Sequence, residues 1–171
     1  MAATPEDLFA FLEELGIETT TVTHPPLHTV EESRALRGDL PGAHIKNLFF
    51  KDKKGALFLV TCLEDRRVDI KALGKAIGAA RLSFGKPDLL FEVLGVRPGA
   101  VTPFALVNDR EEPRRVTFAL DAALRDSETI HAHPLHNEAT TAISWAGLAT
   151  FVAACGHEIT FVDFGQPGMA A

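Results

Sequence analysis

Two strand-like stretches joined by a short polar turn constrain the fold of this chain more than any other feature. Residues 45–51 and 56–63 are rich in apolar side chains, and the four residues 52–55, Asp-Lys-Lys-Gly, separate them. This arrangement predicts a β-hairpin with a tight loop. Because the two strands of a hairpin run antiparallel, the sheet that contains them cannot be purely parallel.

Helix signals alternate with further strand signals along the rest of the chain. Five helices are predicted from caps, prolines and glycine stops, at 5–15, 30–36, 70–77, 87–94 and 145–155. About seven strands are expected; besides the hairpin, they lie at 18–23, 80–84 (a short candidate), 104–108, 115–120, 129–132 and 159–164. We therefore predict one domain over residues 1–171, of the α/β (α+β) class, with a mixed, strongly curved sheet and flanking helices.

Composition excludes several classes of protein. The formal net charge of −6 argues against a generic nucleic-acid binder, which is normally basic. No apolar run approaches the ~20 residues of a membrane span, and residues 1–7 show no secretory signal, so we expect a cytoplasmic protein. Cys62 and Cys155 lie in apolar segments with no metal-ligand spacing, which favours two buried thiols.

Lys46 interrupts the apolar character of the first hairpin strand near its start. Alternation along the strand places Lys46 and Asn47 on opposite faces, each with hydrophobic residues behind it. Two interpretations stay open at this point. The lysine either protects an edge strand against aggregation or lies at a pocket mouth, where it holds a phosphate or a carbonyl oxygen.

The segment from Gly95 to Phe104 contains two glycines and two prolines, which define a loop with a fixed path. Such a loop can direct successive backbone N–H groups to one point, as stabilisation of an oxyanion requires. A purely structural crossover is the alternative.

Three histidines, His131, His133 and His136, lie within six residues and are followed by Asn137. We do not favour a metal site, because no carboxylate or cysteine completes a tetrahedral set and no HExxH pattern occurs. A polar pocket wall fits better. GxSxG, Walker and GxGxxG motifs are also lacking, and classical serine hydrolysis has no support.

These segments together resemble a known family, the YbaK/ProX aminoacyl-tRNA deacylases, which are relatives of the editing insertion domain of bacterial prolyl-tRNA synthetases. The resemblance covers nearly the whole chain. It is carried by HPPLHTVEES (24–33), HIKNLFFKD (44–52), ARLSFG (80–85), GVRPGAVTPFAL (95–106) and HPLHNEATTAIS (133–144). The first and last of these look most like the freestanding alanyl-tRNA(Pro) deacylase branch.

The resemblance implies a six- or seven-stranded, barrel-like mixed sheet and a reaction without metal or cofactor. The family's essential lysine falls on Lys46, and its pocket histidine falls on His133, with His131 as a second candidate. Asn47 and Asn137 follow as polar pocket residues. The family's Gly-x-x-x-Pro loop, with Gly99 as its catalytic glycine, falls on Gly99, Ala100, Val101, Thr102 and Pro103.

The expected function is therefore trans-editing: hydrolysis of the ester that links a wrongly attached alanine to tRNA(Pro), with substrate-assisted catalysis. A pocket too small for proline would give the selectivity. Its expected walls are Leu27, Val30, Ile45, Leu48 and Phe49. The expected partner is the acceptor end of the tRNA, for which a local basic spot suffices, and prolyl-tRNA synthetase is a further candidate; neither DNA nor a membrane is expected.

Two alternatives stay open. The same fold would also suit a deacylase for cysteinyl-tRNA(Pro), or for seryl- or threonyl-tRNA. A non-catalytic module that binds tRNA or a synthetase is the other alternative.

Overall fold

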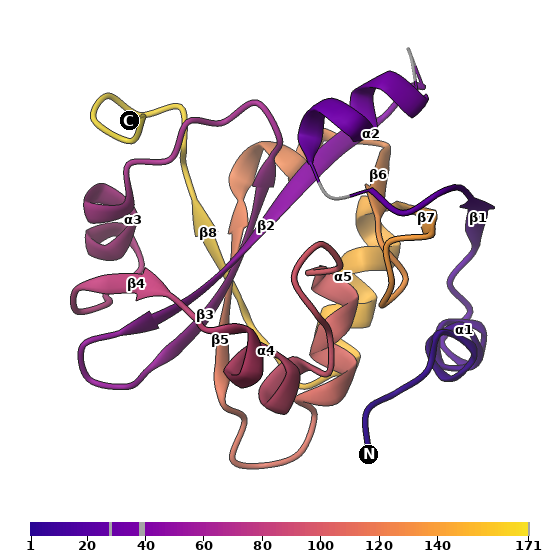
Figure 1. The fold of residues 1–171 in the computed structure, drawn as a ribbon, viewed down its shortest axis with the longest axis horizontal. Coiled ribbons are helices and arrows are strands. Elements are labelled where there is room, and N and C mark those ends of the chain that lie inside the picture. The colour runs from indigo at the N-terminus through magenta and orange to yellow at the C-terminus, as the bar shows by residue number, and fades with distance from the viewer. Residues whose placement is uncertain (28, 38–39, 171) are drawn as a thin grey trace.

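A computed structural model describes residues 1–27, 29–37 and 40–170 (Figure 1). The helices are α1 (Pro5–Glu14), α2 (Val30–Arg37), α3 (Ile70–Ala76), α4 (Pro87–Leu94) and α5 (Trp145–Ala154), with two 3-10 helices, η1 (Pro103–Asn108) and η2 (Ala122–Asp126). The strands are β1 (Thr19–Thr23), β2 (Ala43–Asp52), β3 (Leu57–Leu63), β4 (Leu82–Phe84), β5 (Val116–Asp121), β6 (Thr129–Ala132), β7 (Ala139–Ser144) and β8 (Ile159–Val162). None of the described helices is long and apolar enough to cross a membrane.

The eight strands form one mixed sheet in the order β1-β7-β6-β2-β3-β5-β8, with β4 paired to β2 outside this path. The predicted hairpin is the antiparallel pair β2 and β3, whereas β6 runs parallel to β2 and β5 parallel to β3. The mixed sheet with its surrounding helices confirms the predicted fold class.

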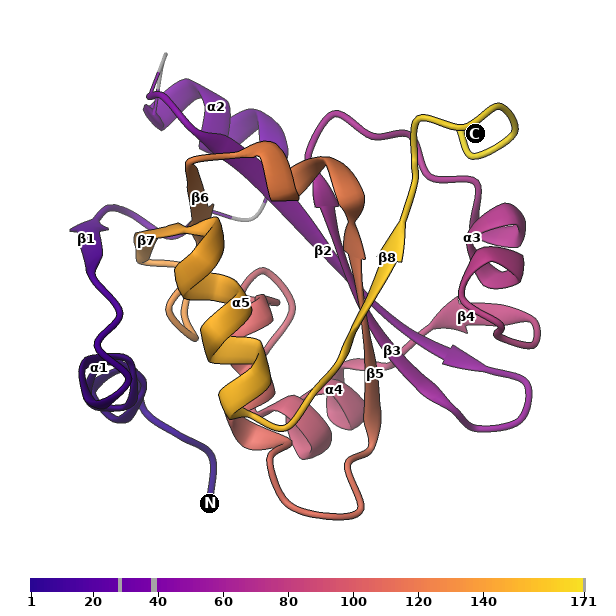
Figure 2. The same cartoon turned by 180° about the vertical axis from the view of Figure 1, so that it is seen from behind.

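Hydrophobic residues on both faces of the hairpin explain its central position. One core holds Phe49 and Leu59 together with residues of α1, α4 and α5, and the other holds Phe50 and Val60 together with Leu73 of α3. Figures 1 and 2 show α3 on one side of the central strands and α4 and α5 on the other. The period of two in the sequence therefore corresponds to two separate cores.

Two predicted elements need correction. Residues 104–108 were expected to form a strand but form η1, because Pro103 starts a helical turn and the Thr102 hydroxyl accepts the N–H of Phe104. A short, fully buried apolar run does not distinguish strand from helix by its period. Strand β7 was not predicted; its threonine- and alanine-rich sequence carries little apolar alternation and leads directly into the Ser144 cap of α5.

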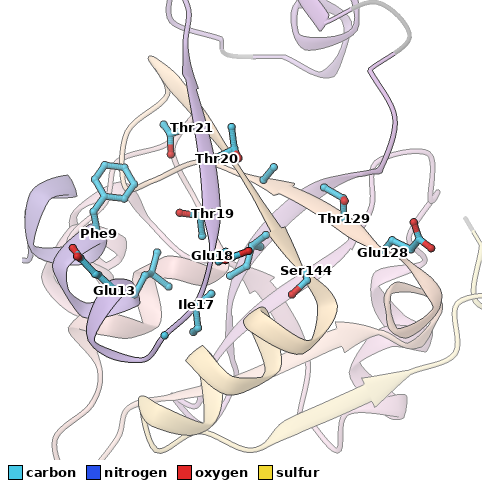
Figure 3. A pocket seen from close by; sticks show the side chains of 14 residues that line it. Phe9, Glu13, Ile17, Glu18, Thr19, Thr20, Thr21, Glu128, Thr129 and Ser144 are labelled. Atoms are coloured by element: carbon cyan, nitrogen blue, oxygen red, sulfur yellow. The ribbon is translucent and has the colours of Figure 1, made fainter.

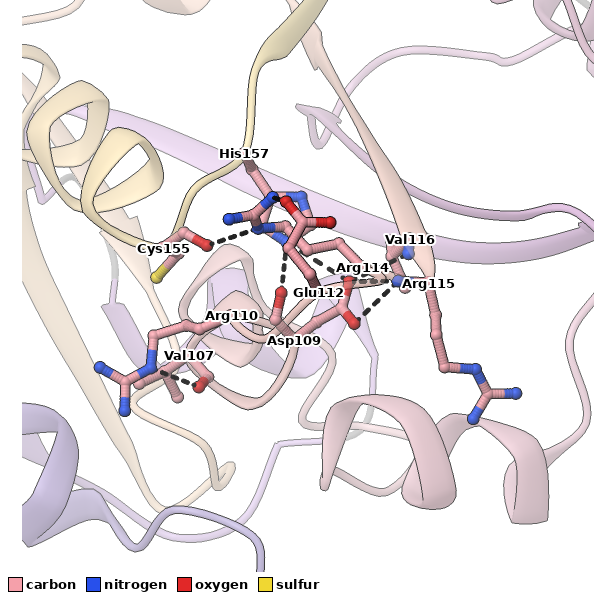
Figure 4. Close-up of polar contacts among 9 residues, drawn as sticks. All are labelled: Val107, Asp109, Arg110, Glu112, Arg114, Arg115, Val116, Cys155 and His157. Carbon is pink, nitrogen blue, oxygen red and sulfur yellow. Dashed lines mark hydrogen bonds and ion pairs between the residues drawn. The ribbon is translucent and has the colours of Figure 1, made fainter.

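A buried carboxylate fixes the loop between η1 and β5 (Figure 4). Asp109 is 6% exposed and accepts the backbone N–H groups of Arg115 (2.9 and 3.1 Å) and Val116 (2.9 Å). The His157 imidazole, which follows α5, lies 2.8 Å from the Asp109 carbonyl oxygen and 3.3 Å from its carboxylate. Asp109 thereby ties the start of β5 to the segment that leads into β8.

Candidate active site

A cavity of about 220 Å³ lies at the start of β2 and collects residues that are distant in sequence. Eight of the residues that line it were predicted as site residues: Leu27, Val30, Ile45, Lys46, Asn47, Gly99, Val101 and His133. The segment before α2, strand β2, the loop after α4 and the end of β6 therefore meet at one point. The three chemically distinctive segments of the sequence share one cavity.

The remaining predicted residues lie around this cavity rather than on it. Leu48 packs against the core beside α3, and Phe49 is 5% exposed in the opposite core. Ala100, Thr102 and Pro103 are buried beneath the loop that presents Gly99 and Val101. The Asn137 amide donates to the carbonyl oxygen of Leu27 at 2.9 Å, so that it holds the segment that forms one cavity wall.

Lys46 approaches the cavity from the same face of β2 as Leu48, opposite to Asn47. Its Nζ donates to the carbonyl oxygen of Arg66, in the turn after β3. An ion pair between the Arg66 guanidinium and the fully buried Asp121, at 2.8 Å, anchors this turn. The hydrogen bond and ion pair with Asp121 raise the pKa of Arg66. The Lys46 amine is thus held at the edge of the cavity by a carbonyl of a fixed turn.

Gly99 has a φ of 90°, a backbone conformation that favours glycine. The N–H of Ala100 donates to Arg97 O at 3.0 Å and is already used in a turn. Among the described residues, the N–H groups of Gly99 and Val101 have no hydrogen-bond partner. These two groups, rather than that of Ala100, are the backbone donors that a bound oxygen could meet.

His133 faces the cavity as a neutral imidazole. Its Nδ1 lies 2.9 Å from the carbonyl oxygen of Ala139, an acceptor, so Nδ1 carries the proton and Nε2 carries the lone pair. Burial is the main reason that the pKa of His133 lies below its ordinary value of 6.5, and the nearby His24 and His136 lower it further. The bond to Ala139 acts in the opposite direction without cancelling the effect of burial.

His131 has a different environment. Its ring stacks on that of His44, with centroids 4.7 Å apart and planes 8° apart, and its Nε2 lies 2.8 Å from the carbonyl oxygen of Pro41. Both rings line a small cavity of about 50 Å³ beside the main one.

No trio of His, Cys, Asp or Glu within the described part of the chain is placed to hold a metal ion. Burial raises the pKa of Cys62 and of Cys155 to about 12, so neither is a ready nucleophile.

Two residues on the cavity, Glu64 and Thr29, were missed by the sequence analysis. Glu64 follows β3 directly; its side chain is 8% exposed and its Oε1 lies 3.4 Å from Arg34 Nε on α2. Its carboxylate thereby links α2 to the end of β3 beside the cavity. A charged residue immediately after a buried strand is the signal that could have identified it.

A larger hollow lies elsewhere, between α1, β1, β6 and β7 (Figure 3). Its volume is about 950 Å³, and its polar lining consists of threonines, Ser144 and three glutamates, Glu13, Glu18 and Glu128. It is wide open to solvent and contains none of the predicted site residues. The smaller cavity at β2 is therefore the better candidate.

Comparison with known proteins identifies the family of the chain. The aminoacyl-tRNA editing domain family matches residues 24–151 of the chain. The chain belongs to this family. The matched range contains every predicted site residue, and membership confirms the resemblance stated from the sequence and assigns the chain to aminoacyl-tRNA editing.

Individual relatives of this editing domain are similar over nearly their whole length. A prolyl-tRNA synthetase associated domain-containing protein 1 from Danio rerio is 41% identical, over 93% of this chain and 86% of that protein. The prolyl-tRNA editing protein ProX of Acetoanaerobium sticklandii is 34% identical, over 91% and 94%. A crystal structure described as that of a candidate trans-editing enzyme for prolyl-tRNA synthetase superposes with a TM-score of 0.69, over 95% of this chain and 98% of that one, at 20% identity. This last likeness supports the fold.

Proposed function

We propose that this editing domain, over residues 1–171, is a hydrolase that removes alanine from mischarged alanyl-tRNA(Pro) in trans. The single observation that supports this most is the convergence of Lys46, the Gly99 loop and a neutral His133 on one cavity of about 220 Å³. An aminoacyl ester needs a cationic or donor group for its ribose-phosphate end, donors for its carbonyl oxygen, and an ordered water. The cavity offers a residue suited to each of these tasks.

The reaction follows from these groups. Water attacks the ester carbonyl carbon, negative charge develops on the carbonyl oxygen, and the bond to the ribose oxygen then breaks and releases alanine and tRNA. The N–H groups of Gly99 and Val101 are available to stabilise the developing charge; one such donor is typically worth roughly 3 kcal/mol. Lys46 anchors the terminal phosphate or ribose by its charge once its amine leaves the Arg66 carbonyl.

The proton of the attacking water needs an acceptor. We propose that the free ribose hydroxyl beside the ester orients the water and relays its proton to the departing ribose oxygen, while Nε2 of His133 orders the water as a hydrogen-bond acceptor. Replacement of that hydroxyl by hydrogen should abolish hydrolysis without preventing binding. Full turnover of the deoxy substrate would contradict the substrate-assisted step.

Selectivity is proposed to come from size. A proline-specific synthetase pocket cannot strongly reject a smaller amino acid, since each missing methylene is worth only about 1–3 kcal/mol. The cavity here has apolar walls from Leu27, Val30 and Ile45 and suits a small side chain. Such a sieve admits alanine and excludes the proline ring.

We propose the acceptor end of tRNA(Pro) as the partner, met in the cytoplasm where tRNA is charged, with prolyl-tRNA synthetase as the source of the substrate. The acidic balance of the chain, −6, suits a contact confined to the tip of the tRNA. Few phosphate contacts predict a shallow dependence of binding on salt concentration.

A panel of charged tRNAs tests the proposal. Hydrolysis is measured with alanyl-, cysteinyl-, seryl-, threonyl- and prolyl-tRNA(Pro), beside alanyl-tRNA(Ala). Fast hydrolysis of alanyl-tRNA(Pro) alone is the expected result. A preference for the cysteinyl, seryl or threonyl ester would identify that amino acid, instead of alanine, as the one removed. No hydrolysis of any ester would indicate a binding module.

A further inference from the structure

One buried hydroxyl group lies directly behind the candidate active site. Thr61 is in β3, opposite Asn47 of β2 in the antiparallel register, and its side chain is 0% exposed. Its Oγ1 donates to Asn47 Oδ1 at 2.6 Å. The residues before and after it in β3, Val60 and Cys62, are buried and apolar.

A hydroxyl in such surroundings requires an explanation. Burial of a hydroxyl without a partner costs free energy, whereas a valine of the same shape would fill this position with no such cost. The short bond to Asn47 removes the cost in the folded protein. It also couples the only hydroxyl-bearing side chain of β3 to a residue of the cavity.

In the structure the Oδ1 end of the Asn47 carboxamide faces Thr61 and β3. Because Oδ1 accepts from Thr61, Nδ2 is directed away from β3. Within the described residues Nδ2 has no hydrogen-bond partner, yet no buried polar side-chain atom there is unsatisfied, so Nδ2 is open to the cavity. An amide nitrogen only donates, and a donor at this point suits the carbonyl oxygen of an ester. If the Asn47 carboxamide were rotated by half a turn, its oxygen would face the cavity and would repel the carbonyl oxygen of the ester.

We propose that Thr61 is a positioning residue for ester hydrolysis: its hydroxyl fixes the Asn47 carboxamide so that Nδ2 donates to the carbonyl oxygen of the aminoacyl ester. This inference rests on the proposed function of the cavity. Thr61 itself does not touch the substrate and acts only through Asn47. Donor orientation that is fixed before the reaction is what makes such a group effective in the transition state.

The variants Thr61→Val and Thr61→Ser separate the hydroxyl from the shape of the side chain. Thr61→Val keeps the branched side chain and should lower kcat for alanyl-tRNA(Pro) about tenfold, the equivalent of one ordinary hydrogen bond, with KM nearly unchanged. Thr61→Ser should restore most of kcat. Thr141→Val is the matched control: Thr141 is also 0% exposed and bonds another threonine hydroxyl, that of Thr21, at 2.8 Å, but on the pair β1 and β7. This control should keep the wild-type kcat.

A double variant tests the pathway through Asn47. If Thr61 acts only through that residue, Asn47→Ala combined with Thr61→Val should be no slower than Asn47→Ala alone. Wild-type kcat in folded Thr61→Val, loss of activity that Thr61→Ser does not restore, or additive losses in the double variant would each overturn the proposal.

A readout that does not depend on activity keeps this proposal separate from the proposed function. The order parameter of the Asn47 side-chain amide, from ¹⁵N relaxation, should fall in Thr61→Val and recover in Thr61→Ser. An amide equally ordered in wild type and Thr61→Val would overturn the positioning role. The amide could lose order in Thr61→Val while the wild-type chain hydrolyses no charged tRNA. That result would refute the proposed function, and with it the use of this amide in ester hydrolysis.

Discussion

Nδ1 of His133 lies 2.9 Å from the carbonyl oxygen of Ala139, and this contact determines which nitrogen of the ring can accept a proton or a water. Because Nδ1 donates to that oxygen, Nε2 carries the lone pair. Burial lowers the pKa of His133 below 6.5, so the imidazole is neutral at neutral pH. The ring is therefore prepared to accept a hydrogen bond from water rather than to carry charge.

The activity should therefore depend on pH in a defined direction. The active form is the neutral one, so the rate of hydrolysis should stay level down to pH 6.5 and fall only below it, as Nε2 becomes protonated. The rate is measured between about pH 5 and about pH 8, with a correction for spontaneous ester hydrolysis. His133→Ala should lower the rate and remove this step; a fall with its midpoint above pH 6.5 would contradict the assignment.

Widening the cavity should change its selectivity. Replacement of Val30 or Ile45 by alanine removes methylenes from its wall, and kcat/KM for prolyl-tRNA(Pro) should rise about tenfold or more relative to alanyl-tRNA(Pro). Val22→Ala, at a position that is 60% exposed on β1, should leave the ratio unchanged. The same substrate profile in all these variants would count against a steric sieve.

Gly99 and Gly55 form a matched pair for testing the loop. Their φ angles are 90° and 89°, so alanine at either position introduces similar backbone strain, about 1 kcal/mol of folding free energy. Gly99→Ala should lower kcat at least tenfold because it displaces the N–H donors. Gly55→Ala, in the turn between β2 and β3, should destabilise the protein similarly and keep its activity. Equal activities would argue against the loop as the site of carbonyl binding.

The Asp109 cluster in Figure 4 should affect stability and not catalysis. Asp109→Ala leaves the N–H groups of Arg115 and Val116 without their acceptor and should reduce the free energy of unfolding by about 3 kcal/mol. Urea denaturation measures the loss. Glu112→Ala is the control from the same loop, since its side chain is 75% exposed and its ion pair with Arg114 should contribute less than about 1 kcal/mol.

Much of the fold could be predicted because local signals and tertiary packing agree. The hairpin of β2 and β3 has apolar residues on both faces, and both faces are in fact buried. Residues 104–108 were predicted as a strand but form η1, because residues 104–107 are all apolar and buried and no polar side chain among them reveals the period. The small residues of β7 gave too weak a signal to predict a strand.

The site was predictable to the extent that its residues have unusual sequence surroundings. Lys46 and Gly99 are conspicuous because a charge interrupts a strand and a glycine lies between prolines. Thr61 was missed because a threonine within a strand is an ordinary residue in sequence, and Glu64 because its one signal, a charge directly after a buried strand, is common at strand ends. Their importance arises only from register, which places Thr61 opposite Asn47 and Glu64 beside the cavity.

The most direct test of the central claim is single-turnover hydrolysis of alanyl-tRNA(Pro) by wild type and by Lys46→Ala, with the thermal unfolding of both recorded. Lys75→Ala, an exposed lysine of α3 remote from the cavity, is the control for a lost positive charge. We expect wild type and Lys75→Ala to hydrolyse the ester at similar rates and folded Lys46→Ala to lose nearly all turnover. A folded Lys46→Ala that retains the wild-type rate would contradict the assignment of this cavity as the editing site.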